Sequence, residues 1–244
     1  MAGTIASERC LEFVQSQTRP MNEIAPARHQ EQEPHVITVS RQAGSGAHAV
    51  SDALLPMLEA RASSPTMSWK VFDRELVEQV LKEHDLPERM AAFMPEDRMS
   101  EMANTLDELF GLHPSAWSLV RKTAETILHL AKLGNVIIIG RAGNIITQHM
   151  AGAIHVRLVG SKEQRISHVM DHRDLSREAA SVYVRDHDLG RKRYVERYYA
   201  RDIDDPLLYH MVLNTDRLGY EETARLIASS VHDVEIRTPI PAIG

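Results

Sequence analysis

The sequence predicts an α/β fold in which helices cover both faces of a parallel β-sheet. Short runs of β-branched residues alternate along the chain with patterns typical of helices, and this alternation indicates a parallel sheet. Two of the runs are almost wholly apolar, as expected of strands that are buried on both faces. The chain has 244 residues, of which 43% are hydrophobic, so it can form the core of one large domain or of two small ones.

Five runs predict five strands, at residues 36–39, 71–72, 136–139, 154–159 and 211–213. Ligands of such sheets bind outside the carboxyl ends of the strands. We therefore expect functional residues in the segments that directly follow these runs.

Helical patterns fill the intervals between the strands. The first, residues 47–60, contains Pro56, which removes one backbone hydrogen bond, so we expect it to kink or end the helix. Ser115 can cap the next helix and Gly134 can end it. Two further patterns cover residues 162–172 and 221–231.

The predicted domain, residues 35–234, is flanked by segments of different composition. Residues 1–34 combine a short helical pattern with a linker rich in polar residues and proline, and residues 235–244 form a tail. We expect one domain with an N-terminal appendage.

Three features indicate a cytoplasmic protein without a membrane partner. The single cysteine, Cys10, cannot form an internal disulfide, which excludes a disulfide-stapled secreted scaffold. The longest apolar run, residues 136–139, is far shorter than the roughly 20 residues of a membrane helix. The first residues also lack the basic and apolar regions of a signal peptide.

Charge is unevenly distributed along the chain. The formal net charge is -6, yet residues 185–201 contain six basic and three acidic residues, so this segment is +3 and the remainder is -9. Such a segment is either a solvated helix face or a place where an anion binds.

The segment after the first strand has the layout of a phosphate-binding loop. A strand leads into Gly44-Ser45-Gly46 and then into a helix, an arrangement in which backbone N–H groups and the helix N-terminus attract anions. The P-loop motif is incomplete, because Arg41 stands at its first glycine, Ala47 at its lysine and His48 at its Ser/Thr. A tight turn between strand and helix is the alternative interpretation.

Five segments, taken in order, carry a family resemblance. They are Ser-Arg-Gln-Ala-Gly-Ser-Gly at residues 40–46, Val-Phe-Asp-Arg-Glu-Leu-Val at 71–77, the apolar run ending Ile-Gly-Arg-Ala-Gly-Asn at 136–144, Arg-Asp-His-Asp-Leu-Gly-Arg at 185–191, and Leu-Asn-Thr-Asp at 213–216. In this order and at these spacings the chain resembles the cytidylate kinase-like proteins over about residues 35–232. Residues 136–144 correspond to that family's Val-Ile-x-Gly-Arg-Gly-x-Asn pattern.

The resemblance implies a P-loop nucleoside monophosphate (NMP) kinase fold with a five-stranded parallel sheet, an NMP-binding insertion at about residues 78–114 and a lid at about 174–204. It also implies ATP-dependent phosphoryl transfer to a nucleoside monophosphate, with CMP or dCMP as the expected acceptor and Mg²⁺ as the metal. The family itself often lacks the P-loop lysine.

Residues of the donor side follow from this resemblance. Gly44, Ser45 and Gly46, continued by Ala47 and His48, would hold the β-phosphate of ATP. Arg185 and Arg191 would close over the transferring phosphate, since a guanidinium is always charged and binds phosphate oxygens in pairs. Arg185, Asp188 and Arg191 are three residues apart, so on a helix we expect them to share one side. Arg41 or His48 could supply the charge of the absent lysine.

The acceptor would bind at the ends of the other strands. Arg141 would hold its phosphate, and Asp73 would lie near the acceptor or the magnesium. Arg74 would contact the acceptor phosphate or point to water, and Asn144 belongs to the predicted acceptor site. Asp188 would orient an arginine or contact the acceptor.

Two further functions stay open. Without the lysine the protein could bind nucleotides as a catalytically impaired regulator, or it could phosphorylate another small phosphorylated acceptor. We expect no protein metal site, because the 13 histidines lack metal-ligand spacing. Tyrosines among the basic residues could stack on RNA, but the acidic remainder would repel a polyanion, so we expect no nucleic-acid partner. The sequence does not predict the oligomeric state.

Overall fold

A computed structural model of the chain describes residues 35–60, 68–73 and 116–233. Its five strands form one sheet in the order β2-β3-β1-β4-β5, and every hydrogen-bonded pair of neighbours is parallel. The strands are β1 (Val36–Arg41), β2 (Lys70–Phe72), β3 (Val136–Ile139), β4 (Ala153–Val159) and β5 (Met211–Asn214). The predicted α/β fold with a five-stranded parallel sheet is confirmed.

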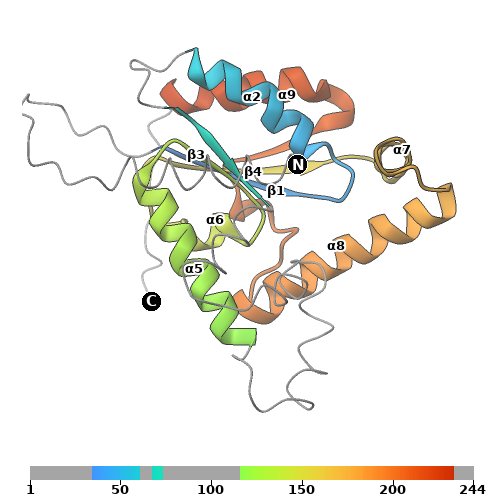
Figure 1. Cartoon of the computed structure of the whole chain (residues 1–244), viewed down its shortest axis with the longest axis horizontal. Helices are drawn as coiled ribbons and strands as arrows, with labels where there is room; N and C mark the ends of the chain where they lie inside the picture. Colours follow the sequence, from blue (N-terminus) through green and yellow to red (C-terminus); the bar gives the residue numbers. More distant parts are fainter. Residues whose placement is uncertain (1–34, 61–67, 74–115, 234–244) are drawn as a thin grey trace, which may run out of the picture.

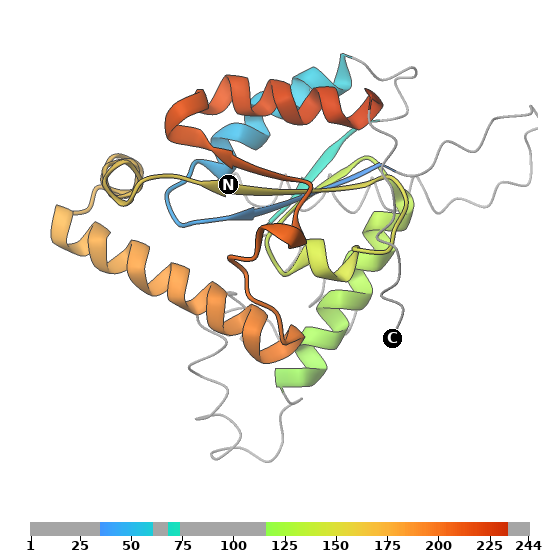
Figure 2. The same cartoon turned by 180° about the vertical axis from the view of Figure 1, so that it is seen from behind.

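Helices cover both faces of this sheet (Figures 1 and 2). Side chains of a strand alternate between its faces, so Ile37 and Val39 pack with α2 (Ala47–Glu59) and α9 (Thr215–Asp233) in one fully buried cluster. On the opposite face, Val36 packs with Ile127 and Leu130 of α5 (Ala116–Leu133) in a second cluster. The apolar runs of β1 and β3 are therefore explained by burial on both faces.

The strand order places β1 at the centre of the sheet. The chain passes from β1 to the β2 side and later crosses to β4 on the opposite side, so the loop after β1 lies at the point where the strand order reverses. Ligands of doubly wound sheets bind at that point. Of the two helices that follow β4, α7 (Lys162–Arg173) lies beyond this end of the sheet, and α8 (Arg177–Tyr199) runs from there back toward α5 (Figure 1). The remaining short elements are α6 (Gly143–Ile146) and the 3₁₀ helix η2 (Pro206–Leu208).

The helices differ from the sequence expectation in two places, α2 and α9. Helix α2 continues past Pro56 to Glu59, because a proline in the last turn costs only one intrahelical hydrogen bond. Helix α9 begins at Thr215, earlier than expected, and Gly219 interrupts it with φ 71° and ψ 171°. The predicted lid region contains one straight element, α8, of 23 residues.

Several predicted segments lie outside the described residues: the leader 1–34, the insertion 78–114 and the tail 235–244. Among the helices that the structure describes, none is both long and apolar enough to cross a membrane.

A buried histidine stands in the middle of β4. His155 is 5% exposed, its Nδ1 lies 2.8 Å from Thr38 Oγ1 on β1, and its ring lies 4.9 Å from that of His210. Burial, and secondarily the neighbouring His210, lower the pKa of His155 to about 3. The folded protein therefore keeps this imidazole neutral at pH values where the unfolded chain protonates it.

This histidine makes the fold sensitive to acid. Only the unfolded state takes up the His155 proton between about pH 6.5 and pH 3, so His155 lowers the free energy of unfolding as the pH falls through this window. The loss is up to about 1.4 kcal/mol for each pH unit. Urea denaturation at several pH values is expected to show a shallower dependence in His155→Asn, in which an amide can replace the ring Nδ1. His149→Asn, at an exposed site, is the matched control and should keep the wild-type slope. Equal slopes in all three proteins would contradict the assignment.

Candidate active site

The loop after β1 adopts the conformation that its two glycines permit. Gly44 and Gly46 have φ of 78° and 80°, in the left-handed region. A Cβ on Gly44 would lie 2.3 Å from the carbonyl oxygen of Arg165, and one on Gly46 would lie 2.2 Å from the ring of Tyr220. Gly46 caps α2 without a side-chain hydrogen bond, so the amides of the first turn face the loop unblocked by a capping side chain. Both glycines are thus required by backbone conformation and by packing.

Two charged side chains, one from α7 and one from α8, hold the loop against these helices. The N–H of Ala43 donates to Asp188 Oδ1 (2.6 Å), and its carbonyl accepts from Arg165 Nη1 (2.9 Å). Arg165 Nη1 also donates to Asp188 Oδ2 (2.6 Å). We refer to Ala43, Arg165 and Asp188 as the Ala43 clamp. It joins the loop to one residue of each helix.

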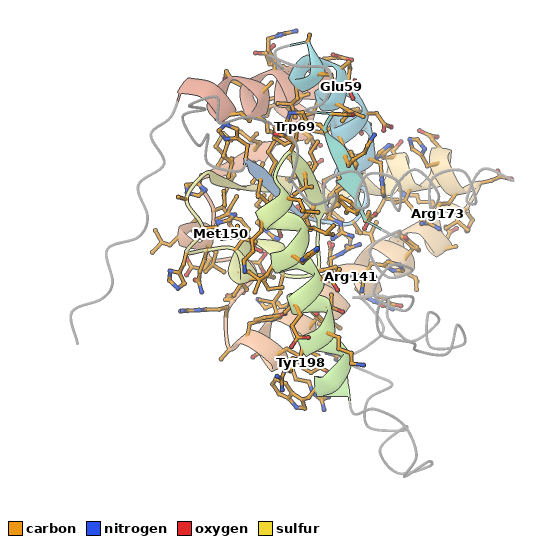
Figure 3. The ribbon with its side chains drawn as sticks, turned by 60° about the vertical axis from the view of Figure 1, so that its left-hand side comes forward. Glu59, Trp69, Arg141, Met150, Arg173 and Tyr198 are labelled. Atoms are coloured by element: carbon orange, nitrogen blue, oxygen red, sulfur yellow. The ribbon has the colours of Figure 1, made fainter. Side chains whose placement is uncertain are left out.

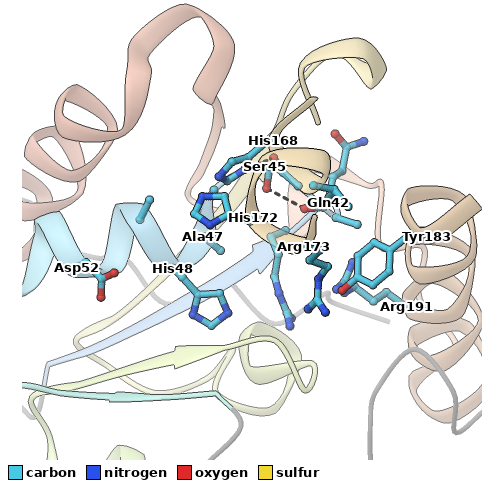
Figure 4. Close-up of a pocket in the computed structure, with 16 residues that line it drawn as sticks. Gln42, Ser45, Ala47, His48, Asp52, His168, His172, Arg173, Tyr183 and Arg191 are labelled. Atoms are coloured by element: carbon cyan, nitrogen blue, oxygen red, sulfur yellow. Dashed lines mark hydrogen bonds between the residues drawn. The ribbon is translucent and has the colours of Figure 1, made fainter. Parts of the chain in front are cut away.

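A cavity of about 580 Å³ lies between the loop and these two helices (Figure 4). Residues 41–49 form one wall, and α7 and α8 form the other with Arg173, Tyr183 and Arg191 among others. Three of its lining side chains are arginines and one, Asp52, is a carboxylate. We refer to this space as the loop cavity; its charge favours an anionic ligand.

Asp73 lies at the carboxyl end of β2, where Arg41 and His48 converge on it. Arg41 Nη2 is 3.6 Å from Asp73 Oδ1, and His48 Nε2 is 3.0 Å from Asp73 Oδ2. Burial alone would raise the pKa of Asp73, but the hydrogen bond from His48 and the charges of Arg41, His48 and Arg141 outweigh it and lower that pKa. The hydrogen bond to Asp73 raises the pKa of His48 above its ordinary value, against the opposing effect of burial.

The turn after β3 is strained. Gly140, Arg141 and Ala142 have consecutive positive φ values of 81°, 56° and 55°, although only the first is a glycine. Arg141 is only 7% exposed there, and its charge acts on Asp73. In Figure 3, Arg141 lies beside α5 near the centre of the molecule, whereas Arg173 lies on the side formed by α7 and α8. Strained residues of this kind are typical of functional sites.

A second cavity, of about 230 Å³, adjoins the first and shares Arg41, Gln42 and Arg191 with it. Arg157 of β4 lines this second cavity, donating to Ser40 Oγ (2.9 Å) and to Asp204 Oδ1 (2.6 Å). The structure therefore continues the basic lining from the loop toward β4.

The structure brings most of the predicted donor-side residues together. Those that line the loop cavity are Arg41, Gly44, Ser45, Gly46, Ala47, His48 and Arg191. Asp188 contacts two arginines. It accepts a hydrogen bond from Arg165 in the Ala43 clamp, and its Oδ1 lies 3.5 Å from Nη1 of Arg191.

Arg185 is not brought to the cavity. Its side chain is 66% exposed and pairs with Asp186, so the expected common side of Arg185, Asp188 and Arg191 is not observed. Each step of three residues turns about 60° short of a full circle, because a helix has 3.6 residues per turn. Two such steps accumulate to about 120°, which separates Arg185 from Arg191.

The structure brings together only some of the predicted acceptor residues. Asp73 and Arg141 interact electrostatically at the strand ends. Asn144 is buried, and its Nδ2 donates to the carbonyl of Leu208 (3.4 Å), which ties it to η2. Arg74 lies outside the described residues.

The sequence analysis missed three arginines of this region. Arg157 interrupts an apolar strand, and that position was a usable signal for a buried functional or structural charge. Arg165 and Arg173 lie on a polar helix, where nothing in the local pattern separates them from solvated residues.

Comparisons with known proteins identify the family of the chain. The model of the cytidylate kinase-like family matches residues 36–217, a range that includes all five segments of the predicted resemblance. A cytidylate kinase from Staphylothermus marinus is 30% identical over 101 residues, which are 38% of this chain and 52% of that protein. The chain thus spans about half the length of this curated relative.

A solved structure supports the fold. The crystal structure of an uncharacterized protein from Eubacterium ventriosum covers 82% of this chain and 99% of its own, with 16% identity and a TM-score of 0.59. At this identity the likeness shows the arrangement of helices and strands alone.

The contacts around Asp73 predict that two substitutions shift the pKa of His48 in opposite directions. Asp73→Asn is expected to lower the pKa of His48, because the hydrogen bond and the negative charge that raise it are weakened. Arg41→Gln is expected to raise it, because Arg41 opposes the imidazolium charge. NMR titration of the His48 ring measures both shifts. Asp52→Asn, which removes a weaker contribution, should lower the pKa less. Shifts of the same sign in Asp73→Asn and Arg41→Gln would contradict this geometry.

The strained turn predicts that one mutation to glycine stabilises the protein. Ala142 has φ 55°, at the place where the family pattern has glycine. Ala142→Gly is expected to raise the free energy of unfolding by about 1 kcal/mol, since a non-glycine residue is disfavoured in this region by roughly that amount. The same substitution inside α2, Ala53→Gly, should lower it by about 1 kcal/mol. Denaturant titration of both variants tests the opposite signs, and a loss of stability in Ala142→Gly would rule out strain at this turn.

Proposed function

The chain belongs to the cytidylate kinase-like family, and from this premise we propose that it transfers the terminal phosphoryl group of ATP to a nucleoside monophosphate, with CMP or dCMP as the acceptor. One observation carries the proposal: a glycine loop at the end of the central strand opens on a cavity lined by arginines from three elements, β1, α7 and α8. Phosphoryl transfer requires mainly such positioning and charge stabilisation.

The loop cavity suits the phosphates of the donor. The backbone of Gly44, Ser45 and Gly46 and the amides of Ala47 and His48 would bind phosphate oxygens at the start of α2. Ser45 Oγ donates to the carbonyl of Gln42 (2.8 Å), which keeps the loop closed on itself. Arg191 faces the cavity from α8 and would bind the transferring group in the transition state.

The acceptor side would form around Asp73 and Arg141. Arg141 would bind the acceptor phosphate at the end of β3, and Asp73 would orient Arg41 toward the same space. Residues 78–114 and Arg74 would complete this side, and Asn144 would support it from η2. Arg185, which pairs with Asp186 in the structure, could act only after a rearrangement of α8. We assign the kinase domain to residues 35–234, with the lid at about 174–204.

Magnesium fits the oxygen donors near the loop. Mg²⁺ in such sites is held by one or two carboxylates together with phosphate oxygens and water. His48 stands at the position where the P-loop motif has a Ser/Thr hydroxyl that ligates Mg²⁺. Near His48, the oxygen donors are the carboxylates of Asp73 and Asp52. When bound, the ion would neutralise phosphate charge. The chain's own part is to keep Asp73 ionised, and the lowered pKa of that carboxyl serves this.

A regulator that binds nucleotide without turnover is the second candidate. Ala47 supplies no charge at the lysine position, and Arg41 and His48 both contact Asp73. This observation favours binding over catalysis, so the two functions must be separated by turnover.

The decisive experiment follows ADP release from Mg-ATP with CMP, dCMP, UMP and AMP in turn. We expect turnover with CMP and dCMP. Arg191→Ala should lower kcat by about 10²- to 10³-fold, as the loss of one transition-state donor does elsewhere. Arg141→Ala should raise the KM for the acceptor while leaving the affinity for ATP unchanged.

Controls make this result specific. Arg225→Ala removes an exposed arginine of α9 that pairs with Glu222 and should leave both parameters unchanged. Melting curves show whether the variants are folded. Tight ATP binding without turnover on any acceptor would support the regulator instead, and no nucleotide binding at all would overturn both candidates.

A further inference from the structure

The loop cavity lacks a charge that P-loop kinases place in the loop itself. Ala47 stands at the position of the lysine that reaches the β- and γ-phosphates, and its methyl group carries no charge. Transfer of a phosphoryl group still requires a cation near those oxygens. The question is which cation lining the cavity can take this place.

The cations on the loop side are already engaged. Arg41 and His48 both contact the carboxylate of Asp73, at 3.6 Å and 3.0 Å. Their charge therefore balances Asp73 at the end of β2. On α8, Arg191 has Asp188 at 3.5 Å.

Arg173 differs from these three residues. It is the last residue of α7, it lines the loop cavity, and no described carboxylate pairs with it. Its guanidinium carbon lies 4.6 Å from the centre of the Tyr183 ring. Figure 4 shows Arg173 between His48 and Tyr183. A ring attracts a cation through its quadrupole and does not neutralise it, so the positive charge of Arg173 stays available to a ligand.

Tyr183 is itself held in place. Its ring stacks on that of His187 with centroids 3.6 Å apart, and it packs against the apolar cluster that α7 and α8 share with Ala43. A ring fixed in this way restricts the rotamers of Arg173 and reduces the entropy lost when the guanidinium binds.

We propose that Arg173, positioned by Tyr183, supplies from the C-terminal end of α7 the phosphate-binding charge that Ala47 cannot supply from the loop. This inference rests on the proposed function for the identity of the donor, and its chemical content is the binding of adjacent phosphate groups. Arg173 would contact the phosphate oxygens, and Tyr183 is a positioning residue that acts through it.

The test measures binding of inorganic tripolyphosphate and of AMP by calorimetry at fixed ionic strength. Arg173→Ala and Arg173→Gln should weaken tripolyphosphate binding by about 10- to 100-fold, the range for loss of a charged hydrogen-bond donor. AMP, with one phosphate, should be affected less. Arg177→Ala is the matched control, because Arg177 is the first residue of α8, close to Arg173 in the sequence, and pairs with Glu163 outside the cavity. It should bind tripolyphosphate within about twofold of wild type.

Tyr183 is tested by a pair of substitutions and a double-mutant cycle. Tyr183→Phe keeps the ring and should bind tripolyphosphate as wild type does. Tyr183→Leu keeps an apolar side chain but removes the ring, and should weaken binding about 2- to 5-fold. That effect should vanish in an Arg173→Ala background, since a merely structural role would persist there.

The outcomes separate this inference from the kinase proposal. If Arg173→Ala and Arg173→Gln bind tripolyphosphate as wild type does, the inference fails, whatever the turnover of CMP. If the variants lose tripolyphosphate binding while wild type phosphorylates no acceptor, the kinase proposal fails and the inference stands. A wild-type protein that binds no tripolyphosphate would overturn the inference, and the kinase proposal would still be decided by the turnover assay.

Discussion

The architecture of the site depends on the two hydrogen bonds that hold the peptide groups of Ala43. A loop with two left-handed glycines has few side chains of its own to fix it, so its polar backbone groups must find partners elsewhere. Asp188 accepts from the Ala43 N–H, Arg165 donates to its carbonyl, and the two side chains pair with each other at 2.6 Å. Arg165 is 9% exposed beside an apolar cluster, so removal of Asp188 would leave its buried guanidinium with backbone carbonyls as its only partners among these contacts. The loop, α7 and α8 therefore form one unit.

This unit explains how an acidic chain can build a basic site. The cations near the loop differ in their partners. Arg165 pairs with Asp188 and Arg157 pairs with Asp204, so these two arginines stabilise the fold. Arg173 instead faces a tyrosine ring. Cations that are already paired contribute little net attraction for an incoming anion, because their field is largely cancelled nearby. The affinity of the cavity for phosphate then depends on few groups, and the net charge of -6 does not oppose it.

The sequence was informative where a short local pattern determines the structure. Apolar runs predict the buried strands, and Gly44 and Gly46 predict the tight loop, because backbone conformation leaves few alternatives. The meeting of Arg41 and Asp73 follows from the shared edge of parallel strands. The sequence could not predict that Arg185 faces solvent, since that depends on the rotation of α8 against the body. Nor could it separate Arg173 from other helical arginines, since its partner Tyr183 lies on another helix.

A phosphate-binding charge that comes from the end of α7 behaves differently from one in the loop. A lysine after Gly46 would carry its charge within the loop, whereas Arg173 reaches the loop cavity from α7, which is docked against the loop through the Ala43 clamp. A ligand that contacts Arg173 then binds the docked arrangement more tightly than any other and shifts the population toward it. The same contact that replaces the lysine thereby couples phosphate binding to the position of α8, the helix that also carries Arg191.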